Sequence, residues 1–297
     1  MRPSVSLTEY AGPWGWSQSH NTRPPLCVRG WTRRRWIWTS LICDRPDLAR
    51  KVVSPACVED VVSIDGPIGS GKSSVAFELS RLLGWTCIST GLMYRAVALK
   101  VRDVERRERA AAACEAARTS RFTFSSAHGS LRLHVDDVDV TDDISDPVVL
   151  PLTSEVAQDP DLRALLLRRQ RELARSRPSV VEGRDANTLI VPDARWKFFL
   201  DAPPEVRYRR LHDVHLLSTD SALGYADFVR GMRLVDERDR SRLDESRRLA
   251  DVIHHENFAG LSASQDAMIL YYYICRPAEI RRNSSILRTM AVPTDTS

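Results

Sequence analysis

One eight-residue segment, GPIGSGKS at residues 66–73, constrains the fold of this 297-residue chain more than any other feature. It matches the phosphate-binding pattern G-x-x-x-x-G-K-[ST] in full. An apolar run at 61–64, typical of a buried parallel strand, precedes it, and apolar residues at helical spacing follow it over 73–83. Because strand, glycine-rich turn and helix occur in the order that the motif requires, the sequence predicts a loop that binds the phosphates of a nucleoside triphosphate.

The residue types of this loop fit that chemistry. Its glycines allow successive backbone N–H groups to turn inward around a phosphate, and the following helix adds the positive end of its dipole. We expect Lys72 to reach the β- and γ-phosphates as a catalytic residue and the Ser73 hydroxyl to ligate Mg²⁺. The predicted nucleotide-binding set is Gly66, Gly69, Ser70, Gly71, Lys72, Ser73 and Ser74.

The loop alone indicates ATP or GTP binding and leaves kinase, GTPase, helicase and motor open. The other reading of these residues is a tight glycine-rich turn without a ligand, and the correct strand and helix on its two sides argue against it.

Further along the chain, helices alternate with buried strands. Residues 159–175 have helical spacing, with Asp159 as N-cap and Pro160 at the first helical position. Short apolar runs at 179–181 and 197–200 predict buried strands. Such alternation indicates an α/β fold with a parallel central sheet. The polar stretch 102–158 contains an alternating strand at 131–135, and we expect it to form a small inserted subdomain.

The charge of the chain is unevenly distributed. Residues 1–43 hold six arginines and one acid, so this segment has a charge of +5. Because the whole chain has a net charge of +4, the remaining residues together have a charge of −1. We therefore expect no nucleic-acid partner. The longest apolar run, 267–275, is far shorter than the roughly 20 residues of a membrane-spanning helix, so we expect no membrane association. Six cysteines without a C-x-x-C pair suggest neither a zinc site nor disulfides, which favours a reducing, cytoplasmic setting.

The two ends of the chain yield no fold. Residues 1–57 hold five of the seven tryptophans and show no sustained period of 2 or 3.6, so we expect a disordered leader unrelated to the rest. An over-long gene prediction, an organelle transit sequence and an appended interaction segment all remain open. The tail at 258–297 is left unassigned.

The acceptor side begins about twenty residues after the loop, with STGLMYR at 89–95. This segment resembles the D-[ST]-G-x-[MI]-Y-R segment of the cytidylate kinase family. Five further segments resemble that family in the same order, so that the similarity spans roughly residues 60–257. They are 139–144, 154–163, 182–185, 191–194 and 238–242.

The resemblance implies roles for individual residues. Ser154, Arg163 and Asp185 occupy the positions that hydrogen-bond the cytosine ring, and a buried polar site of this kind rejects bases that leave it unpaired. Asp239 matches the carboxylate that accepts from the ribose hydroxyls. The family's arginines at the acceptor phosphate are matched by Arg95, Arg184 and Arg242. Thr90 belongs to the same acceptor-binding set. Arg207 and Arg210 resemble the catalytic arginines of the family's mobile lid.

The implied fold is a three-layer P-loop kinase fold, long bacterial type, with a parallel central sheet, an inserted monophosphate-binding subdomain and a short lid. The implied activity is transfer of the γ-phosphoryl group of ATP, with Mg²⁺, to CMP or dCMP by a monomer. The kinase-like domain is expected at 58–257, with its core at 58–101, 159–203 and 219–257, the insertion at 102–158 and the lid at 204–218.

Three residues depart from the family pattern. Ser89 stands where an acidic residue is expected. Glu182 keeps the charge expected at its position but has a longer side chain. We expect either change to shift the position of Mg²⁺ or of a water molecule. Val235 stands where an arginine is usual, four residues before Asp239. Losing that charge-assisted hydrogen bond should cost about 1.5–3 kcal/mol of acceptor binding, so we expect weakened CMP binding and a lower Michaelis constant for Val235→Arg.

Other functions compatible with the sequence are a P-loop kinase for UMP or another small acceptor such as shikimate, a nucleotide-binding relic without turnover, and an RNA-binding module that uses the leader. Ser154 and Arg163 in the insertion argue against shikimate. The leader offers no sheet on which bases would stack, which argues against RNA. Full activity after deletion of residues 1–57 would exclude an essential role for the leader.

Overall fold

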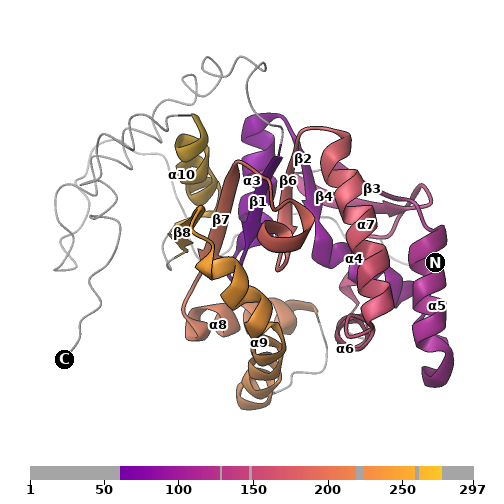
Figure 1. Cartoon of the computed structure of the whole chain (residues 1–297). Helices are drawn as coiled ribbons and strands as arrows, with labels where there is room; N and C mark the ends of the chain where they lie inside the picture. The colour runs from indigo at the N-terminus through magenta and orange to yellow at the C-terminus, as the bar shows by residue number, and fades with distance from the viewer. Residues whose placement is uncertain (1–60, 128, 147–148, 219–223, 258–260, 276–297) are drawn as a thin grey trace, which may run out of the picture. The chain divides into compact units, whose positions relative to one another are not determined.

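The computed structural model describes residues 61–127, 129–146, 149–218, 224–257 and 261–275 (Figure 1). The chain separates into two compact units, 1–46 and 47–297, and every described residue belongs to the second. The predicted leader and most of the predicted tail lie outside the described residues.

A five-stranded parallel sheet forms the centre, as the alternation of strands and helices predicted. Its strands are β1 (Val61–Asp65), β2 (Thr86–Ser89), β6 (Ser179–Gly183), β7 (Trp196–Asp201) and β8 (Val252–Glu256). Their order is β2-β6-β1-β7-β8, and every neighbouring pair is parallel. The strands expected at 179–181 and 197–200 are β6 and β7. Every residue of β6 is buried, as expected for a strand covered on both faces.

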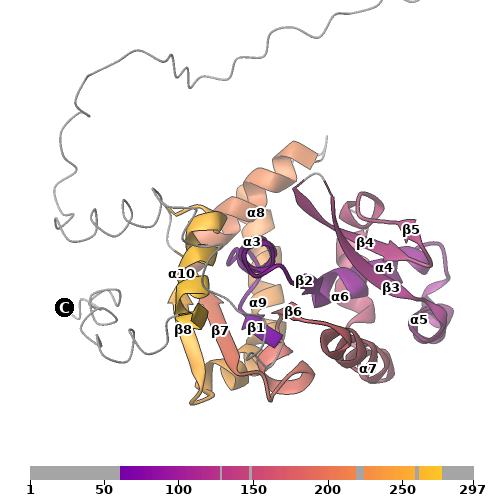
Figure 2. The ribbon, with the colours of Figure 1, turned by 90° about the horizontal axis from the view of Figure 1, so that it is seen from above.

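Helices cover both faces of this sheet (Figure 2). On one face, α3 (Lys72–Leu83) and α10 (Ala263–Cys275) pack on the alternate side chains Val62 and Ile64 of β1. On the other face, α7 (Pro160–Ser176) and the π-helical turn η2 (Ala186–Ile190) pack against Ile88 and Val181. The remaining helices of the core are α4 (Thr90–Lys100), α8 (Pro204–Ser218) and α9 (Tyr225–Arg248). This is the three-layer α/β arrangement that the sequence predicts.

The predicted cap of α7 is confirmed. The Asp159 side chain accepts a hydrogen bond of 2.8 Å from the backbone N–H of Leu162, and Pro160 occupies the first turn. The cap satisfies an N–H group that lacks an intrahelical partner, which fixes the start of α7.

The polar stretch between α4 and α7 has a sheet and a core of its own. Its elements are α5 (Arg106–Thr119), β3 (Phe122–Ala127), β4 (Ser130–Val135), β5 (Val138–Asp139), η1 (Asp143–Ser145) and α6 (Val149–Val156). The three strands form an antiparallel sheet in the order β3-β4-β5, and the strand expected at 131–135 is β4. Leu133 and Ile144 are fully buried together with Met93 of α4 and Leu162 of α7. The insertion is therefore packed onto these two helices of the main domain.

The core continues past residue 257, where the sequence analysis ended the domain. Ala267, Leu270 and Ile274 of α10 are buried in the same cluster as the side chains of α3. His255 of β8 and the fully buried Asp266 of α10 lie 2.7 Å apart, which joins the last strand to this helix. The apolar run at 267–275 thus lies in a core helix, with Ala267, Leu270 and Ile274 on its inner face. Within the described ranges, no helix is long and apolar enough to cross a membrane.

Candidate functional site

The loop between β1 and α3 has the geometry of an anion cradle. Gly69 and Gly71 adopt left-handed backbone conformations, with φ of 75° and 87°. A Cβ at Gly71 would lie 2.4 Å from the Asn257 side-chain nitrogen, and one at Gly66 would lie 2.0 Å from the Leu200 carbonyl oxygen. Only glycine fits these positions. No side chain caps α3, so the N–H groups of its first turn are available to an anion bound in the loop.

Lys72 lies at the start of α3, with only 7% of its surface exposed. Its Nζ donates a 3.2 Å hydrogen bond to the Pro67 carbonyl oxygen within the loop. The pKa of Lys72 is lowered to about 8, first by burial and then by the nearby Arg184, while the carboxylates of Glu182 and Asp239 act in the opposite direction. A phosphate group would complete the environment of this ammonium group.

Two of the three departures from the family pattern meet at one carboxylate oxygen. Glu182 is 3% exposed, and its Oε1 accepts hydrogen bonds from the Ser89 hydroxyl and, at 3.1 Å, from the Ser73 hydroxyl. Hydroxyl and carboxylate oxygens are the ligands that Mg²⁺ prefers, together with phosphate oxygens and water. In the described part of the chain, no three His, Cys, Asp or Glu side chains gather as a metal cage. The donor set therefore fits a magnesium ion shared with a nucleotide.

The two arginines predicted for the lid occupy different environments on α8. Arg207 is 4% exposed, forms a two-pronged ion pair with Asp236 of α9 at 2.6 and 3.0 Å, and donates to the Ile68 carbonyl oxygen of the loop at 2.9 Å. These contacts give Arg207 the position of an anchor between α8, α9 and the loop.

Arg210 is held beside the phosphate loop by Asn257. The guanidinium donates to the Asn257 side-chain oxygen at 3.1 Å, and the Asn257 nitrogen donates to the Ser70 carbonyl oxygen at 3.0 Å. Arg210 also lies 3.9 Å from the position that a Cβ at Gly71 would take. Of the two predicted lid arginines, Arg210 is thus the one next to the phosphate cradle.

The predicted acceptor residues come together at the end of β6 and the inner face of α9. Arg163 of α7 pairs with Asp185 at 2.6 Å, and Arg242 of α9 lies 3.5 Å from the same carboxylate. Asp239 of α9 pairs with both Arg184 and Arg242. Residues more than 70 positions apart in the sequence therefore form one connected network of opposite charges.

Arg95 and Thr90 of α4 border this network. Arg95 is half-buried, and its pKa is lowered first by burial and then by the neighbouring Arg184. A guanidinium group whose charge is disfavoured by burial and by a second guanidinium group marks a place for an anion. The Thr90 hydroxyl donates to the Glu182 carbonyl oxygen at 3.0 Å and lies where a Cβ at Gly183 would be. Thr90 therefore packs α4 against the end of β6.

Ser154 lies on α6 of the insertion, on the other side of the same network. Its hydroxyl accepts a 2.7 Å hydrogen bond from Arg238 of α9. Val235, one turn earlier on α9, is half-buried. The structure thus brings together all the acceptor residues predicted from the sequence along α4, α6, α7, α9 and the end of β6.

Three important residues, Asp236, Asn257 and Asp65, were not predicted from the sequence. Asp236 and Asn257 hold the two lid arginines. Asp65, fully buried at the end of β1, accepts from the backbone N–H groups of Ala186 and Asn187 at 2.8 and 3.0 Å and from the Ser246 hydroxyl at 2.8 Å. Burial raises the pKa of Asp65 to about 6. The only sequence signal was a carboxylate inside an otherwise apolar strand.

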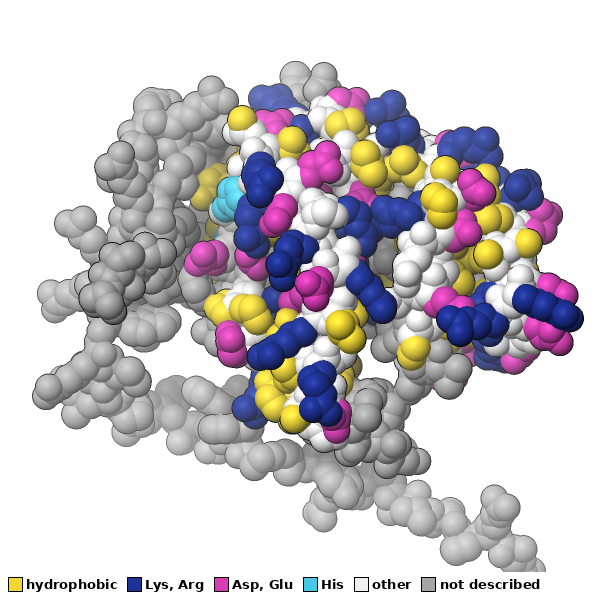
Figure 3. All heavy atoms as spheres, turned by 60° about the horizontal axis from the view of Figure 1, so that its bottom comes forward, with side chains coloured by type: hydrophobic (Ala, Val, Ile, Leu, Met, Phe, Trp, Pro, Cys, Tyr) yellow, Lys and Arg dark blue, Asp and Glu magenta, His cyan; other side chains and the backbone are white. Residues whose placement is uncertain are grey.

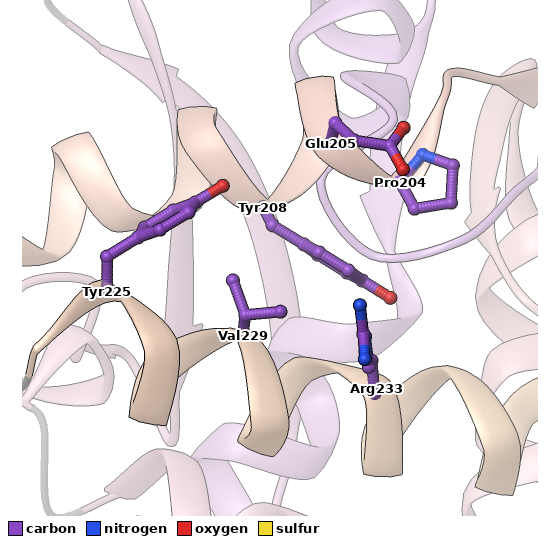
Figure 4. A pocket seen from close by; sticks show the side chains of 6 residues that line it. All are labelled: Pro204, Glu205, Tyr208, Tyr225, Val229 and Arg233. Carbon is purple, nitrogen blue, oxygen red and sulfur yellow. The ribbon is translucent and has the colours of Figure 1, made fainter.

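A second surface feature lies apart from these residues. A hollow of about 370 Å³ opens between α8 and α9, where Tyr208, Tyr225, Val229 and Arg233 line it (Figure 4). None of the predicted site residues lines this hollow. On the face drawn in Figure 3, basic side chains are interspersed with acidic ones, and no single basic patch stands out.

Comparison with known proteins assigns the chain to a family. The family model described as "Cytidylate kinase" matches residues 62–269. Similar curated proteins are the cytidylate kinases of Pelotomaculum thermopropionicum, 41% identical over 63% of this chain and 80% of the relative, and of Caldanaerobacter subterraneus subsp. tengcongensis, 37% identical over 61% and 79%. The cytidylate kinase of Mycolicibacterium paratuberculosis is 38% identical over 71% of this chain and 86% of the relative. The predicted family is thereby confirmed, and this chain belongs to the cytidylate kinase family.

Proposed function

We propose that this protein transfers the γ-phosphoryl group of ATP to CMP or dCMP, giving ADP and CDP or dCDP. The observation that carries the proposal is the end of β6. Glu182 contacts Ser73 of the phosphate loop, while Arg184 and Asp185 pair with the acceptor residues Asp239 and Arg163. Four consecutive residues therefore place a triphosphate site and a monophosphate site next to each other.

On the donor side, the loop binds and orients ATP. The backbone N–H groups of the glycine loop and the start of α3 cradle the phosphates, and the Lys72 ammonium neutralises charge at the β- and γ-phosphates. Ser73 and Glu182 would hold Mg²⁺, which when bound offsets the negative charge of the phosphates. Arg210, held by Asn257 beside the loop, adds a second positive charge there.

On the acceptor side, the residues of the charge network have three roles, at the phosphate, the ribose and the base. Arg95, Arg184 and Arg242 bind the phosphate of the monophosphate through planar guanidinium groups. Asp239 accepts from the ribose hydroxyls. Arg163, Asp185 and Ser154 bind the base, whose amino group requires an acceptor and whose ring nitrogen and carbonyl oxygen require donors. The ion pairs among these residues keep the site ordered before the nucleotide arrives.

The chemistry needs no general base, because a nucleoside monophosphate is already an anionic nucleophile near neutral pH. The protein accelerates the reaction by holding the two phosphates in line and by stabilising the charge on the transferring oxygens. Closure of α8 over the loop would exclude water and limit ATP hydrolysis. Both halves of the site come from one chain, so we propose that the protein acts as a monomer. We also propose that it acts in the cytoplasm.

A steady-state assay of ADP formation tests this function. CMP, dCMP, UMP and AMP are offered separately as acceptors with MgATP, and we expect ADP formation to depend on CMP or dCMP. A preference for UMP would reassign the acceptor. No stimulation by CMP, dCMP or UMP would reject the kinase function and favour a protein that binds nucleotides without turnover.

A further inference from the structure

Arg238 makes a contact that no prediction assigned to it. It lies on α9, directly before Asp239, and its Nη1 donates a 2.7 Å hydrogen bond to the hydroxyl of Ser154 on α6. The two residues are 84 positions apart and belong to the main domain and to the insertion. The bond therefore joins α9 to the insertion at the residue expected to contact the base.

This bond determines whether the Ser154 hydroxyl donates or accepts its next hydrogen bond. A guanidinium group only donates hydrogen bonds, whereas a hydroxyl both donates and accepts. Because the Ser154 oxygen accepts from Arg238, its single hydrogen is left to be donated elsewhere. Cytosine presents two acceptors beside its amino group, the ring nitrogen N3 and the carbonyl oxygen O2. A hydroxyl that already accepts from Arg238 is complementary to this edge, and because its hydrogen has fewer orientations left, less rotational freedom is lost when the base binds.

The position of Arg238 also bears on the missing arginine at residue 235. Residues 235 and 238 are three apart on α9 and so lie on the same side of the helix. Val235 supplies no charge, and Arg238 is the residue on that side whose guanidinium reaches across to α6. It restores a charged contact between α9 and the acceptor side, although at the base and not at the ribose.

We propose that Arg238 is a positioning residue for the acceptor base, which fixes the Ser154 hydroxyl as a donor and ties the insertion to α9. The inference rests on the proposed function, since Ser154 contacts a base only if the acceptor is a nucleoside monophosphate. Arg238 touches no substrate atom in this account and acts through Ser154.

The test compares Michaelis constants for CMP among R238M, R238K, S154A and the double variant S154A/R238M. We expect R238M to raise the Michaelis constant for CMP by about tenfold, with kcat and the Michaelis constant for ATP unchanged within about twofold. R238K keeps the donor and should recover part of the loss. The double variant should bind CMP no more weakly than S154A alone, because the two residues act through one bond. R248M, which removes an exposed arginine from the last turn of the same helix, is the matched control and should behave as wild type.

Calorimetric titration of each protein with CMP separates this inference from the proposed function. If wild type binds CMP without turning it over, the kinase function fails while the R238M effect on the dissociation constant still tests Arg238. An R238M protein that binds and turns over CMP as wild type does would overturn the inference. So would a double variant in which the losses of CMP binding caused by R238M and by S154A simply add. Wild type that does not bind CMP would overturn both proposals. Thermal unfolding of each variant confirms that it is folded.

Discussion

At the residue level, the departures Ser89 and Glu182 compensate for each other. The longer side chain of Glu182 reaches the Ser73 hydroxyl, and Ser89, its register partner on the neighbouring strand β2, donates to the same oxygen. One carboxylate thus serves where the family pattern supplies two. The sequence analysis noted both changes, but only the structure shows that they meet.

Glu182→Gln should weaken the response to Mg²⁺. The substitution removes the charge next to Ser73 and preserves the shape of the side chain, so we expect the Mg²⁺ concentration for half-maximal activity to rise by about tenfold. The number of Mn²⁺ ions bound in the presence of ATP, measured by electron paramagnetic resonance, gives a readout that does not depend on turnover. Ser89→Ala is the control, since it removes a donor and leaves the carboxylate. An unchanged metal requirement in Glu182→Gln would exclude Glu182 from the metal site.

Lys72 should take up a proton when ATP binds at alkaline pH. The pKa of Lys72 is lowered by burial to about 8, below the ordinary lysine value, so the free protein has partly lost this charge at pH 8.5. Bound phosphates favour the ammonium form and restore it. Titration calorimetry at pH 8.5 in two buffers of different ionisation enthalpy should show uptake of roughly half a proton or more per ATP. Near pH 6.5 the uptake should vanish, because Lys72 is already charged. Equal uptake at both pH values would contradict the lowered pKa.

Asp65 should make the stability of the fold depend on pH in the direction opposite to most carboxylates. Its folded pKa of about 6 lies above the ordinary value of 3.8, because burial disfavours the charge. The folded state therefore binds more protons between pH 4 and pH 6, and its stability falls as pH rises through that window. Relative to Asp65→Asn, wild type should gain about 1 kcal/mol of unfolding free energy from pH 7 to pH 5. Urea unfolding at both pH values measures this, and a wild type that loses stability relative to the variant would refute it.

Among the elements, helix α8 places its two predicted lid arginines in different surroundings. Arg207 is bound to Asp236 and to the loop, whereas Arg210 lies beside the cradle on Asn257. Sequence reasoning treated both as lid residues, because spacing on a helix does not show which side chain finds a buried carboxylate. Asp236 and Asn257 come from α9 and from the residue after β8, so no local pattern connects them with α8.

Arg207→Met and Arg210→Met should therefore fail in different ways. Arg207→Met leaves the half-buried Asp236 without its ion-pair partner, with the Tyr208 hydroxyl still donating to it, and we expect a loss of roughly 3 kcal/mol in unfolding free energy. Arg210→Met should leave the unfolding free energy within about 0.5 kcal/mol of wild type and lower kcat by about tenfold or more. Chemical denaturation and steady-state kinetics of both variants check this. Equal stability losses in the two variants would contradict the separate roles.

The elements themselves were largely predictable. The loop with its strand and helix, the cap at Asp159 and the strands β4, β6 and β7 follow from periodicity and capping residues that act locally. The helix α10 was missed because its apolar residues include a run of tyrosines without helical alternation, and its buried face is defined only by packing on α3. The acceptor residues were predicted through a resemblance. Arg238, which bonds to Ser154, and Asp65, which bonds to Ser246, make long-range contacts that spacing does not reveal.

For the molecule as a whole, the parallel sheet is what joins the two halves of the reaction. The carboxyl ends of β1 and β6 are neighbours in the sheet, so the loop after β1 and residues 182–185 necessarily lie side by side. Ligand sites of open α/β sheets occur at such strand ends. The insertion and α9 then bring the side chains that we propose to bind the base to the same edge.

Direct identification of the products tests the central claim most sharply. The protein is incubated with MgATP and CMP, and ³¹P nuclear magnetic resonance follows both nucleotides. We expect CDP and ADP to appear at equal rates and in equal amounts, with little free phosphate, because the acceptor phosphate is held in line with the γ-phosphate. ADP that appears together with inorganic phosphate and without CDP would contradict it.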